Sequence, residues 1–278
     1  FTQDEMVELH YASILHDVGK IGVREHILTK AKKLFPFQRD VVEVRAGYIE
    51  ASIKERAYQA IAAVSDQSEQ DKLKQACDEA VRQVHHDYQF LMDVNEPGFM
   101  KDEQVEDLKR IFEREHPVAQ GAPKHLIKED EFQSLSTRKG SLSDEERREI
   151  ESHVLKSRKF LENIPWSPEL SNVPYIAGWH HEKMNGKGYP DGIPAEETPL
   201  QARIMAVADV FDSLTAADRP YKPAIALERA LEILETMAKF GDLDPEVVNF
   251  FMEERVWEKL NLKVILAKDA SEAQRNAQ

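Results

Sequence analysis

The sequence has little cysteine, little positive charge relative to negative charge, and no long hydrophobic run. Its 278 residues include one cysteine, Cys77, so no disulfide can form within the chain and sites built from several zinc thiolates are excluded. The 37 lysine and arginine residues face 51 aspartate and glutamate residues, and the formal charge of −14 argues against binding to long nucleic acid through its phosphates. Uninterrupted apolar runs stop at five residues, as in Ala60–Val64, far below the ~18 that span a bilayer. We expect a cytoplasmic protein without a membrane segment.

The composition nevertheless predicts a folded protein. Hydrophobic residues make up 41% and charged residues 32% of the chain, which is too apolar for general disorder. The first residues, Phe1-Thr2-Gln3-Asp4-Glu5, are acidic and do not resemble a secretory signal. We expect this sequence to be a fragment with a regulatory domain upstream of residue 1.

Apolar positions follow helical spacing along most of the chain, and no segment alternates like a strand, so we predict an all-α fold. Between Phe37 and about Asp93 we predict two long antiparallel helices with a break at 65–68, the first carrying a periodic apolar series. We expect irregular chain between Pro117 and Gly140. The other predicted helices are 4–16, 102–115, 143–160, 173–182, 200–214, 227–240 and 245–259. The apolar series of the first long helix is Val41, Val44, Tyr48, Ala51 and Tyr58.

Four of the ten histidines lie in apolar surroundings, beside acidic residues. His16-Asp17 follows Ile14-Leu15, and His180-His181 follows an apolar segment ending in Trp179. His153 lies in another predicted helix, and Asp209 lies in the apolar segment 204–211, where an unpaired carboxylate would be costly to bury. Imidazole and carboxylate ligands from different helices suit iron, manganese or zinc in a hydrolytic centre. The alternative for each histidine alone is an ordinary hydrogen-bonded helix residue, but the set as a whole favours a metal site.

A second histidine pair serves as a contrast. His85-His86-Asp87 has the same residue types, but it lies on the polar helical hairpin and no Gly-Lys follows it. Polar runs on long exposed helices are usually solvated. We therefore expect a solvated helix face there.

Several motifs occur in an order that closely resembles the HD-GYP family of cyclic-dinucleotide phosphodiesterases. The matching segments are His16-Asp17-Val18-Gly19-Lys20, Gly140-Ser141-Leu142-Ser143 leading to His153, His180-His181-Glu182-Lys183, Gly188-Tyr189-Pro190-Asp191-Gly192, Pro199–Ile204, Ala208–Leu214 and Asp218–Lys222. A lone His-Asp pair is weak, but this ordered series over roughly 1–35 and 140–250 is specific.

The resemblance implies an HD-type helical bundle with two or three divalent ions, often iron or manganese, that hydrolyses cyclic di-GMP to pGpG or GMP in bacterial second-messenger signalling. By residue it implies the metal ligands His16, Asp17, His153, His180, His181 and Asp209. It also implies catalytic roles for Asp17 and Lys20, phosphate contacts from Lys20, Arg219 and Lys222, and a pocket shaped by Gly188, Tyr189 and Pro190.

The sequence also departs from the family pattern. Family members usually supply a further histidine or glutamate from an earlier helix, whereas 15 residues precede His16 here, so the third ion lacks its ligands. Asn185 stands where the family commonly has aspartate. The pattern stops near residue 35 and resumes near Gly140, which predicts a catalytic domain over 1–35 and 140–268, a helical insertion over 36–139 and a flexible tail over 269–278.

Two questions stay open at this stage. The alternative to an enzyme is a catalytically degenerate domain that binds a cyclic dinucleotide or a protein partner; a different nucleotide phosphohydrolase of the HD group is disfavoured by Gly188-Tyr189-Pro190. The insertion is either a homodimerisation or signal-coupling hairpin, because an amphipathic helix pair must cover its apolar stripe, or a hairpin packed on its own body.

Overall fold

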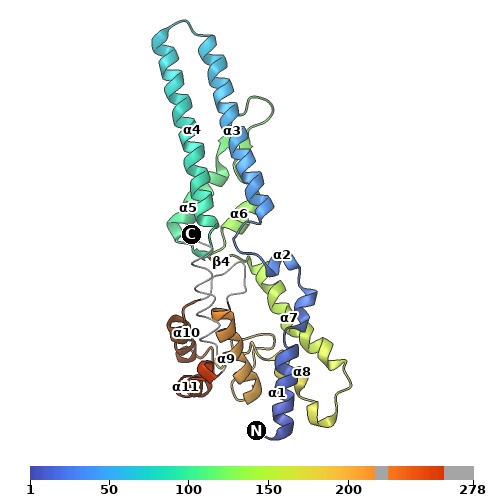
Figure 1. Ribbon diagram of the computed structural model, residues 1–278. Coiled ribbons are helices and arrows are strands. Elements are labelled where there is room, and N and C mark those ends of the chain that lie inside the picture. Colours follow the sequence, from blue (N-terminus) through green and yellow to red (C-terminus); the bar gives the residue numbers. More distant parts are fainter. Residues whose placement is uncertain (217–224, 260–278) are drawn as a thin grey trace. The chain divides into compact units, whose positions relative to one another are not determined.

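The computed structural model describes residues 1–216 and 225–259, and it is almost entirely helical (Figure 1). The predicted all-α fold is therefore confirmed. The chain divides into two compact units, unit 1 with Phe1–Thr29 and Arg148–Gln278, and unit 2 with Lys30–Arg147. In the described part of the chain, no helix has both the length and the apolar character needed to cross a bilayer.

Unit 1 contains the segments on which most of the motifs lie. Its helices are α1 (Gln3–Leu15), η1 (Val18–Gly22), α2 (Glu25–Leu28), α7 (Asp144–Glu162, continuing from unit 2), η2 (Pro168–Leu170), α8 (Val173–Gly178), α9 (Leu200–Thr215), α10 (Leu227–Lys239), α11 (Pro245–Glu253) and α12 (Val256–Lys259). One apolar cluster joins α1, α7, α8 and α9 around Ala12, Leu161 and Ile176. A second cluster joins α9, α10 and α11 around Phe211, Leu234 and Val248. Since α9 contributes to both clusters, it connects the two parts of this unit.

Capping residues explain where several helices begin. Thr2 and Glu5 form a capping box at the start of α1. A second capping box lies before α7, where Glu146 N–H donates to Ser143 Oγ at 3.2 Å and Ser143 N–H donates to Glu146 at 2.8 Å. Asp244 accepts from the backbone N–H groups of Glu246 and Val247, and Pro245 occupies the first position of α11.

Two helices predicted in unit 1 are shorter than expected. The helix expected over 173–182 ends at Gly178, so the two adjacent histidines lie beyond its end. The helix expected over 245–259 is interrupted between α11 and α12, because Arg255 has a left-handed backbone conformation with φ of 49°. Hydrophobic spacing continues through both breaks, and for that reason periodicity alone did not reveal them.

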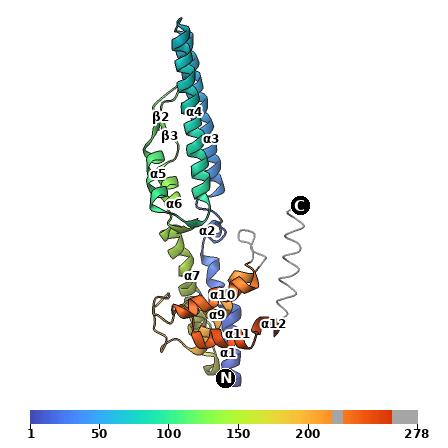
Figure 2. The ribbon, with the colours of Figure 1, turned by 90° about the vertical axis from the view of Figure 1, so that its left-hand side faces the viewer.

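Unit 2 is built on the predicted pair of long helices. These are α3 (Pro36–Ala62) and α4 (Gln67–Asn95), which lie side by side in both views (Figures 1 and 2). Asp66 caps α4 by accepting from Glu69 N–H, and Pro36 begins α3. Further along the chain are β1 (Gly98–Phe99), α5 (Asp102–Glu113), β2 (Glu115–His116), β3 (Lys124–His125), α6 (Glu129–Leu135) and β4 (Lys139–Gly140). The strands form two antiparallel two-residue pairs, β1 with β4 and β2 with β3.

The prediction of irregular chain between Pro117 and Gly140 is wrong over α6. This short helix begins with three acidic residues, and Glu131 accepts from Lys128 N–H at 2.7 Å and pairs with Arg45 of α3 at 2.6 Å. Its Leu135 and α5's Leu108 join the buried core of α3 and α4. A helix of this length is stabilised by packing rather than by its own propensity, so its sequence signal is weak.

The boundaries of unit 2 lie outside the insertion expected over 36–139. The unit runs from Lys30 to Arg147, and its two ends are joined by an ion pair between Lys30 Nζ and Glu146 at 2.7 Å. The Lys30 side chain is 1% exposed, so this pair is shielded from water on the lysine side. The tail predicted over 269–278 lies outside the described residues.

Candidate metal centre

Asp17 is the centre of the histidine cluster in unit 1. Its Oδ2 atom lies 2.5 Å from Lys20 Nζ and 3.3 Å from His16 Nε2, and its Oδ1 atom lies 3.2 Å from His153 Nε2. Burial alone would raise the pKa of Asp17, but the facing His153, His16 and Lys20 hold this pKa well below its usual range. Asp17 is therefore ionised and joins the end of α1 to α7.

Gly19 allows this approach. A Cβ atom on Gly19 would lie 2.1 Å from the carbonyl oxygen of His153, and the Gly19 N–H donates to Ser157 Oγ at 2.9 Å. No other residue type could bring η1 so close to the backbone of α7. The glycine of the His-Asp motif thus positions Asp17 against His153.

Three histidines are each oriented by the backbone carbonyl of the residue three positions earlier in the chain. The Nδ1 atoms of His16, His153 and His180 lie 2.7, 2.5 and 2.6 Å from the carbonyl oxygens of Ser13, Ile150 and Ala177. A carbonyl can only accept a hydrogen bond, so Nδ1 carries the proton and Nε2 of the neutral ring presents a lone pair. This arrangement, in which the second ring nitrogen is fixed by a backbone carbonyl, is common for metal-binding histidines.

The buried Nε2 atoms fit a cation. Among the described residues, Asp17 Oδ1, His153 Nε2 and His180 Nε2 are buried without a hydrogen-bond partner. The 3.2 Å contact between Asp17 Oδ1 and His153 Nε2 therefore brings two potential ligand atoms to the same buried point. Leaving buried acceptors unsatisfied costs free energy, which a divalent ion between them would remove.

The described residues contain two groups that could each hold a metal ion. One is His153, His180 and His181, the other is His16, Asp17 and His180, and within each group the ligand atoms lie within 4.8 Å of one another. Burial, followed by the charge of neighbouring histidines, lowers the pKa of His180 and of His181 to about 3. Both rings are therefore neutral at pH 7 and available as ligands.

Asp209, the sixth expected ligand, lies at the edge of this cluster. Its Oδ1 atom is 3.9 Å from His16 Nε2, its side chain is 25% exposed, and it belongs to neither group. Asp209 is therefore only partly buried, and its role as a ligand stays a prediction. Arg219 and Lys222, the expected phosphate contacts, lie outside the described residues.

The loop after the adjacent histidines folds back onto them. The Tyr189 ring stacks on His181 with 4.8 Å between ring centroids, and the Tyr189-Pro190 bond is cis. A Cβ atom on Gly188 would lie 2.4 Å from Glu182 Cα, so glycine is required there. Of the three residues expected to shape the pocket, Tyr189 thus lies against the histidine cluster, and Gly188 and Pro190 flank it in the chain.

Glu182 holds this loop, a role that the sequence analysis missed. Its carboxylate is 2% exposed and accepts from the backbone N–H groups of Asp191 at 2.8 Å, Gly192 at 3.1 Å and Ile193 at 3.1 Å. Asp191 is in turn held by Arg158 and by Trp179 Nε1. An acidic residue directly after two histidines that follow an apolar segment was the available signal, but its backbone partners lie nine to eleven residues further along the chain.

Asn185 has a structural role that aspartate could not fill. Its Nδ2 donates to the carbonyl oxygen of Phe240 and to Asp242 Oδ1, both at 3.2 Å, and its N–H donates to the carbonyl oxygen of Gly241 at 2.9 Å. An aspartate carboxylate could not donate to either oxygen and would face Asp242. Asn185 therefore ties the loop to the connection between α10 and α11.

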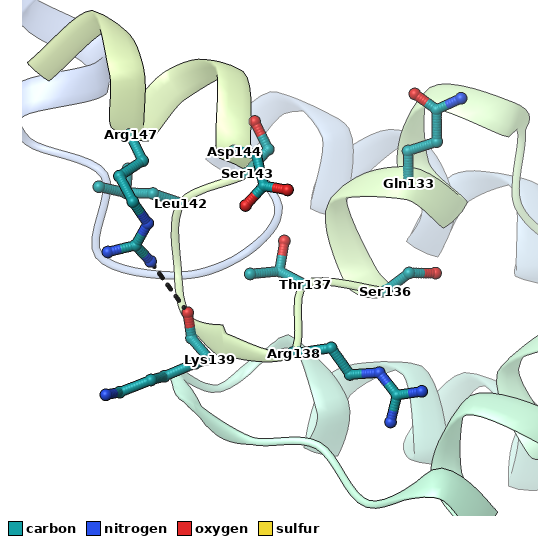
Figure 3. Close-up of a pocket in the computed structure, with 9 residues that line it drawn as sticks. All are labelled: Gln133, Ser136, Thr137, Arg138, Lys139, Leu142, Ser143, Asp144 and Arg147. Atoms are coloured by element: carbon teal, nitrogen blue, oxygen red, sulfur yellow. Dashed lines mark hydrogen bonds between the residues drawn. The ribbon is translucent and has the colours of Figure 1, made fainter. Parts of the chain in front are cut away.

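A separate cavity of about 430 Å³ lies in unit 2, between α6 and the start of α7 (Figure 3). Its lining consists of Gln133, Ser136, Thr137, Arg138, Lys139, Leu142, Ser143, Asp144 and Arg147. The Arg147 guanidinium donates to the Lys139 carbonyl, and Arg138 pairs with Asp102. None of the expected metal ligands lines this cavity, so we assign the chemistry to the histidine cluster.

Comparison with known proteins agrees with the site. Residues 130–247 match the HD domain family, a range that includes His153, His180, His181 and Asp209. This part of the chain is therefore an HD domain.

The relatives make the assignment more specific. The chain is 37% identical over 107 residues to "3'3'-cGAMP-specific phosphodiesterase 3" of Vibrio cholerae, and 51% identical over 81 residues to "Cyclic di-GMP phosphodiesterase response regulator RpfG" of Xanthomonas campestris. It is 37% identical over 115 residues to "Cyclic di-GMP phosphodiesterase" of Thermotoga maritima. These matches cover 38%, 29% and 41% of this chain, and 22%, 21% and 30% of the relatives. These names agree with the resemblance to the HD-GYP family drawn from the motifs, and that resemblance is confirmed.

Proposed function

We propose that this protein is a metal-dependent phosphodiesterase that hydrolyses cyclic di-GMP to pGpG, GMP or both in bacterial second-messenger signalling. The observation that carries the proposal is the 3.2 Å contact between Asp17 Oδ1 and His153 Nε2, two buried potential ligand atoms beside two histidine groups that could each hold a metal ion. The printed names of the relatives support a cyclic dinucleotide as the substrate. A single unpaired cysteine, Cys77, supports a cytoplasmic location.

We further propose two divalent ions, iron or manganese, because two ligand groups share His180. Bound ions of this kind act as Lewis acids and lower the pKa of water. His16, Asp17, His153, His180 and His181 hold them, with Asp209 at the edge of the cluster.

The residues around the ligands bind the substrate in this proposal. Lys20 lies beside Asp17 with its side chain 41% exposed, so its ammonium can reach a phosphoryl oxygen while it remains next to the centre. The Gly188-Tyr189-Pro190 loop lies on the His181 side of the cluster and gives the pocket one wall. A chain of net charge −14 needs such local cations to hold a dianionic ligand.

The test is incubation of the metal-loaded chain with cyclic di-GMP and, separately, with 3'3'-cGAMP, with the products resolved by chromatography. We expect linear dinucleotide or mononucleotide from at least one substrate and loss of turnover after chelation. Metal binding together with tight dinucleotide binding but no product would instead identify the binding module that is the alternative function.

Arg219 and Lys222 give a second test of the same proposal. If these side chains hold phosphate, Arg219→Ala and Lys222→Ala should raise KM about 10-fold with unchanged metal content. Metal analysis and initial rates check both points. Loss of metal in either variant would contradict the proposed role.

A further inference from the structure

Helix α3 has two apolar faces, and none of the described residues covers one of them. Its buried face includes Val42 and Ile49, which are 0% exposed in the core of unit 2. The other face, here called the α3 stripe, consists of Phe37, Val41, Val44, Tyr48, Ala51, Glu55, Tyr58 and Ala62. Phe37, Val44 and Tyr58 are 66%, 73% and 70% exposed, far more than large apolar side chains usually are.

The spacing of the α3 stripe indicates what covers it. Its members follow one another at alternating intervals of four and three residues along the whole helix. A mean interval of 3.5 residues is typical of the apolar seam of a coiled coil, and such a seam is covered by another helix. The helix α4 packs along α3 (Figures 1 and 2), yet the stripe remains exposed, so α4 is not the helix that covers it.

We propose that the α3 stripe pairs with the α3 stripe of a second copy of this chain, with the two helices antiparallel. Glu55 decides the direction. In a parallel pair, Glu55 would face Glu55 of the second copy at a seam position, where like charges repel. In an antiparallel pair Glu55 faces Val44 of the second copy and keeps its carboxylate at the rim.

Side-chain sizes agree with the antiparallel register. Setting Tyr48 opposite Ala51 of the second copy also sets Phe37 opposite Ala62 and Val41 opposite Tyr58, so each large ring meets a smaller side chain. Gly47 lies beside the centre, with nothing within 4 Å of the position of a Cβ atom, and it lets the two backbones approach. Such a contact is isologous, as in most homodimers.

The length of the seam is sufficient for a stable contact. From Phe37 to Tyr58 the stripe runs about 30 Å at ~1.5 Å per residue, which is three heptads. Three heptads are the minimum usually needed for a coiled coil. The contact is carried by unit 2 and does not depend on the metal centre.

The first experiment is sedimentation velocity on the 278-residue chain and on two glutamate variants. Val44→Glu places a carboxylate opposite Glu55 of the second copy, where like charges repel, and Phe99→Glu is the matched control because Phe99 is 78% exposed in the same unit but off the stripe. We expect dimers for the unchanged chain and for Phe99→Glu, and at least 10-fold weaker dimerisation for Val44→Glu. Circular dichroism checks that all three are folded. A monomeric unchanged chain, or a Val44→Glu variant that dimerises as well as the control, would overturn the proposal.

The second experiment tests direction. In a Cys77→Ser background, Val41→Cys and Tyr58→Cys are oxidised separately and as an equal mixture. The antiparallel register predicts a disulfide between the two variants in the mixture, identified by mass, and little cross-linking of either variant alone. Efficient cross-linking of each variant with itself would overturn the antiparallel arrangement.

Discussion

The tripeptides His180-His181-Glu182 and His85-His86-Asp87 carry the same chemical groups in the same order, but their histidines have opposite surroundings. His180 is 1% exposed, and its ring lies close to the rings of His16, His153 and His181. The His86 side chain is 78% exposed. Only the first pair presents buried lone pairs to a common point, so only the first pair can hold a metal ion.

The acidic residue of both tripeptides is buried and hydrogen-bonded. Glu182 is buried and accepts from three backbone N–H groups, and Asp87 is buried and pairs with Arg114 and Gln83. The expectation that the second tripeptide is a solvated face is therefore wrong for Asp87. Polarity of a segment does not show which of its acids will find buried partners, because those partners come from distant parts of the chain.

The largest expected difference between the two tripeptides is the effect of their substitution on metal binding. His181→Ala, and separately Asp17→Asn, should lower metal affinity by about 100-fold or more and abolish hydrolysis, because each removes a ligand from a shared centre. The double variant His85→Ala/His86→Ala is the matched control and should keep both its metal affinity and its hydrolytic activity. Elemental analysis and turnover measure the effect. Full metal content in the first two variants would refute the assignment of the centre.

Local chemistry explains how much of this site could be predicted from the sequence. Five residues could be singled out because a polar group in an apolar segment is costly to bury unless it binds a partner or an ion. The structure brings all five together: His16, Asp17, His153, His180 and His181. The helices also follow their apolar spacing, except where a single backbone position such as Arg255 interrupts it. Tertiary roles were not predictable. Glu182 acquires its function only when the loop folds back on it.

A second, smaller difference follows from the partners of the two acids. Glu182→Gln should lose about 1.5–3 kcal/mol of the free energy of unfolding, since one amide cannot replace a carboxylate that accepts three N–H groups. Turnover should fall because the Gly188-Tyr189-Pro190 loop loses its anchor, while metal content is retained. The three tryptophans, Trp166, Trp179 and Trp257, all belong to unit 1, so fluorescence in urea reports this unit. Unchanged stability would show that the loop is held by other contacts.

Asp87→Asn should affect the other unit. It leaves Arg114 without its ionised partner, and because the Arg114 side chain is 36% exposed we expect a loss of about 1–3 kcal/mol, less than for a fully buried pair. Hydrogen exchange of the α4 amides should accelerate, with no change in metal content or tryptophan fluorescence. A change in metal content would contradict the separation of the two sites.

The smallest expected effect concerns His116, a buried histidine of unit 2 without a metal cluster around it. It is 5% exposed, its Nε2 has no hydrogen-bond partner among the described residues, and burial, only partly opposed by Asp87, lowers its pKa. The unfolded chain therefore takes up a proton below the ordinary pKa of about 6.5 while folded His116 does not, so unit 2 loses stability as the pH falls from 7 to 5.5. The loss is at most about 1.4 kcal/mol per pH unit.

Hydrogen exchange of α4, corrected for the intrinsic exchange rate at each pH, should show this slope in the unchanged chain and a smaller slope in His116→Gln. Equal slopes would mean that His116 is protonated in the folded state, and the contrast between a buried neutral histidine here and the histidines of the candidate metal centre in unit 1 would then fail.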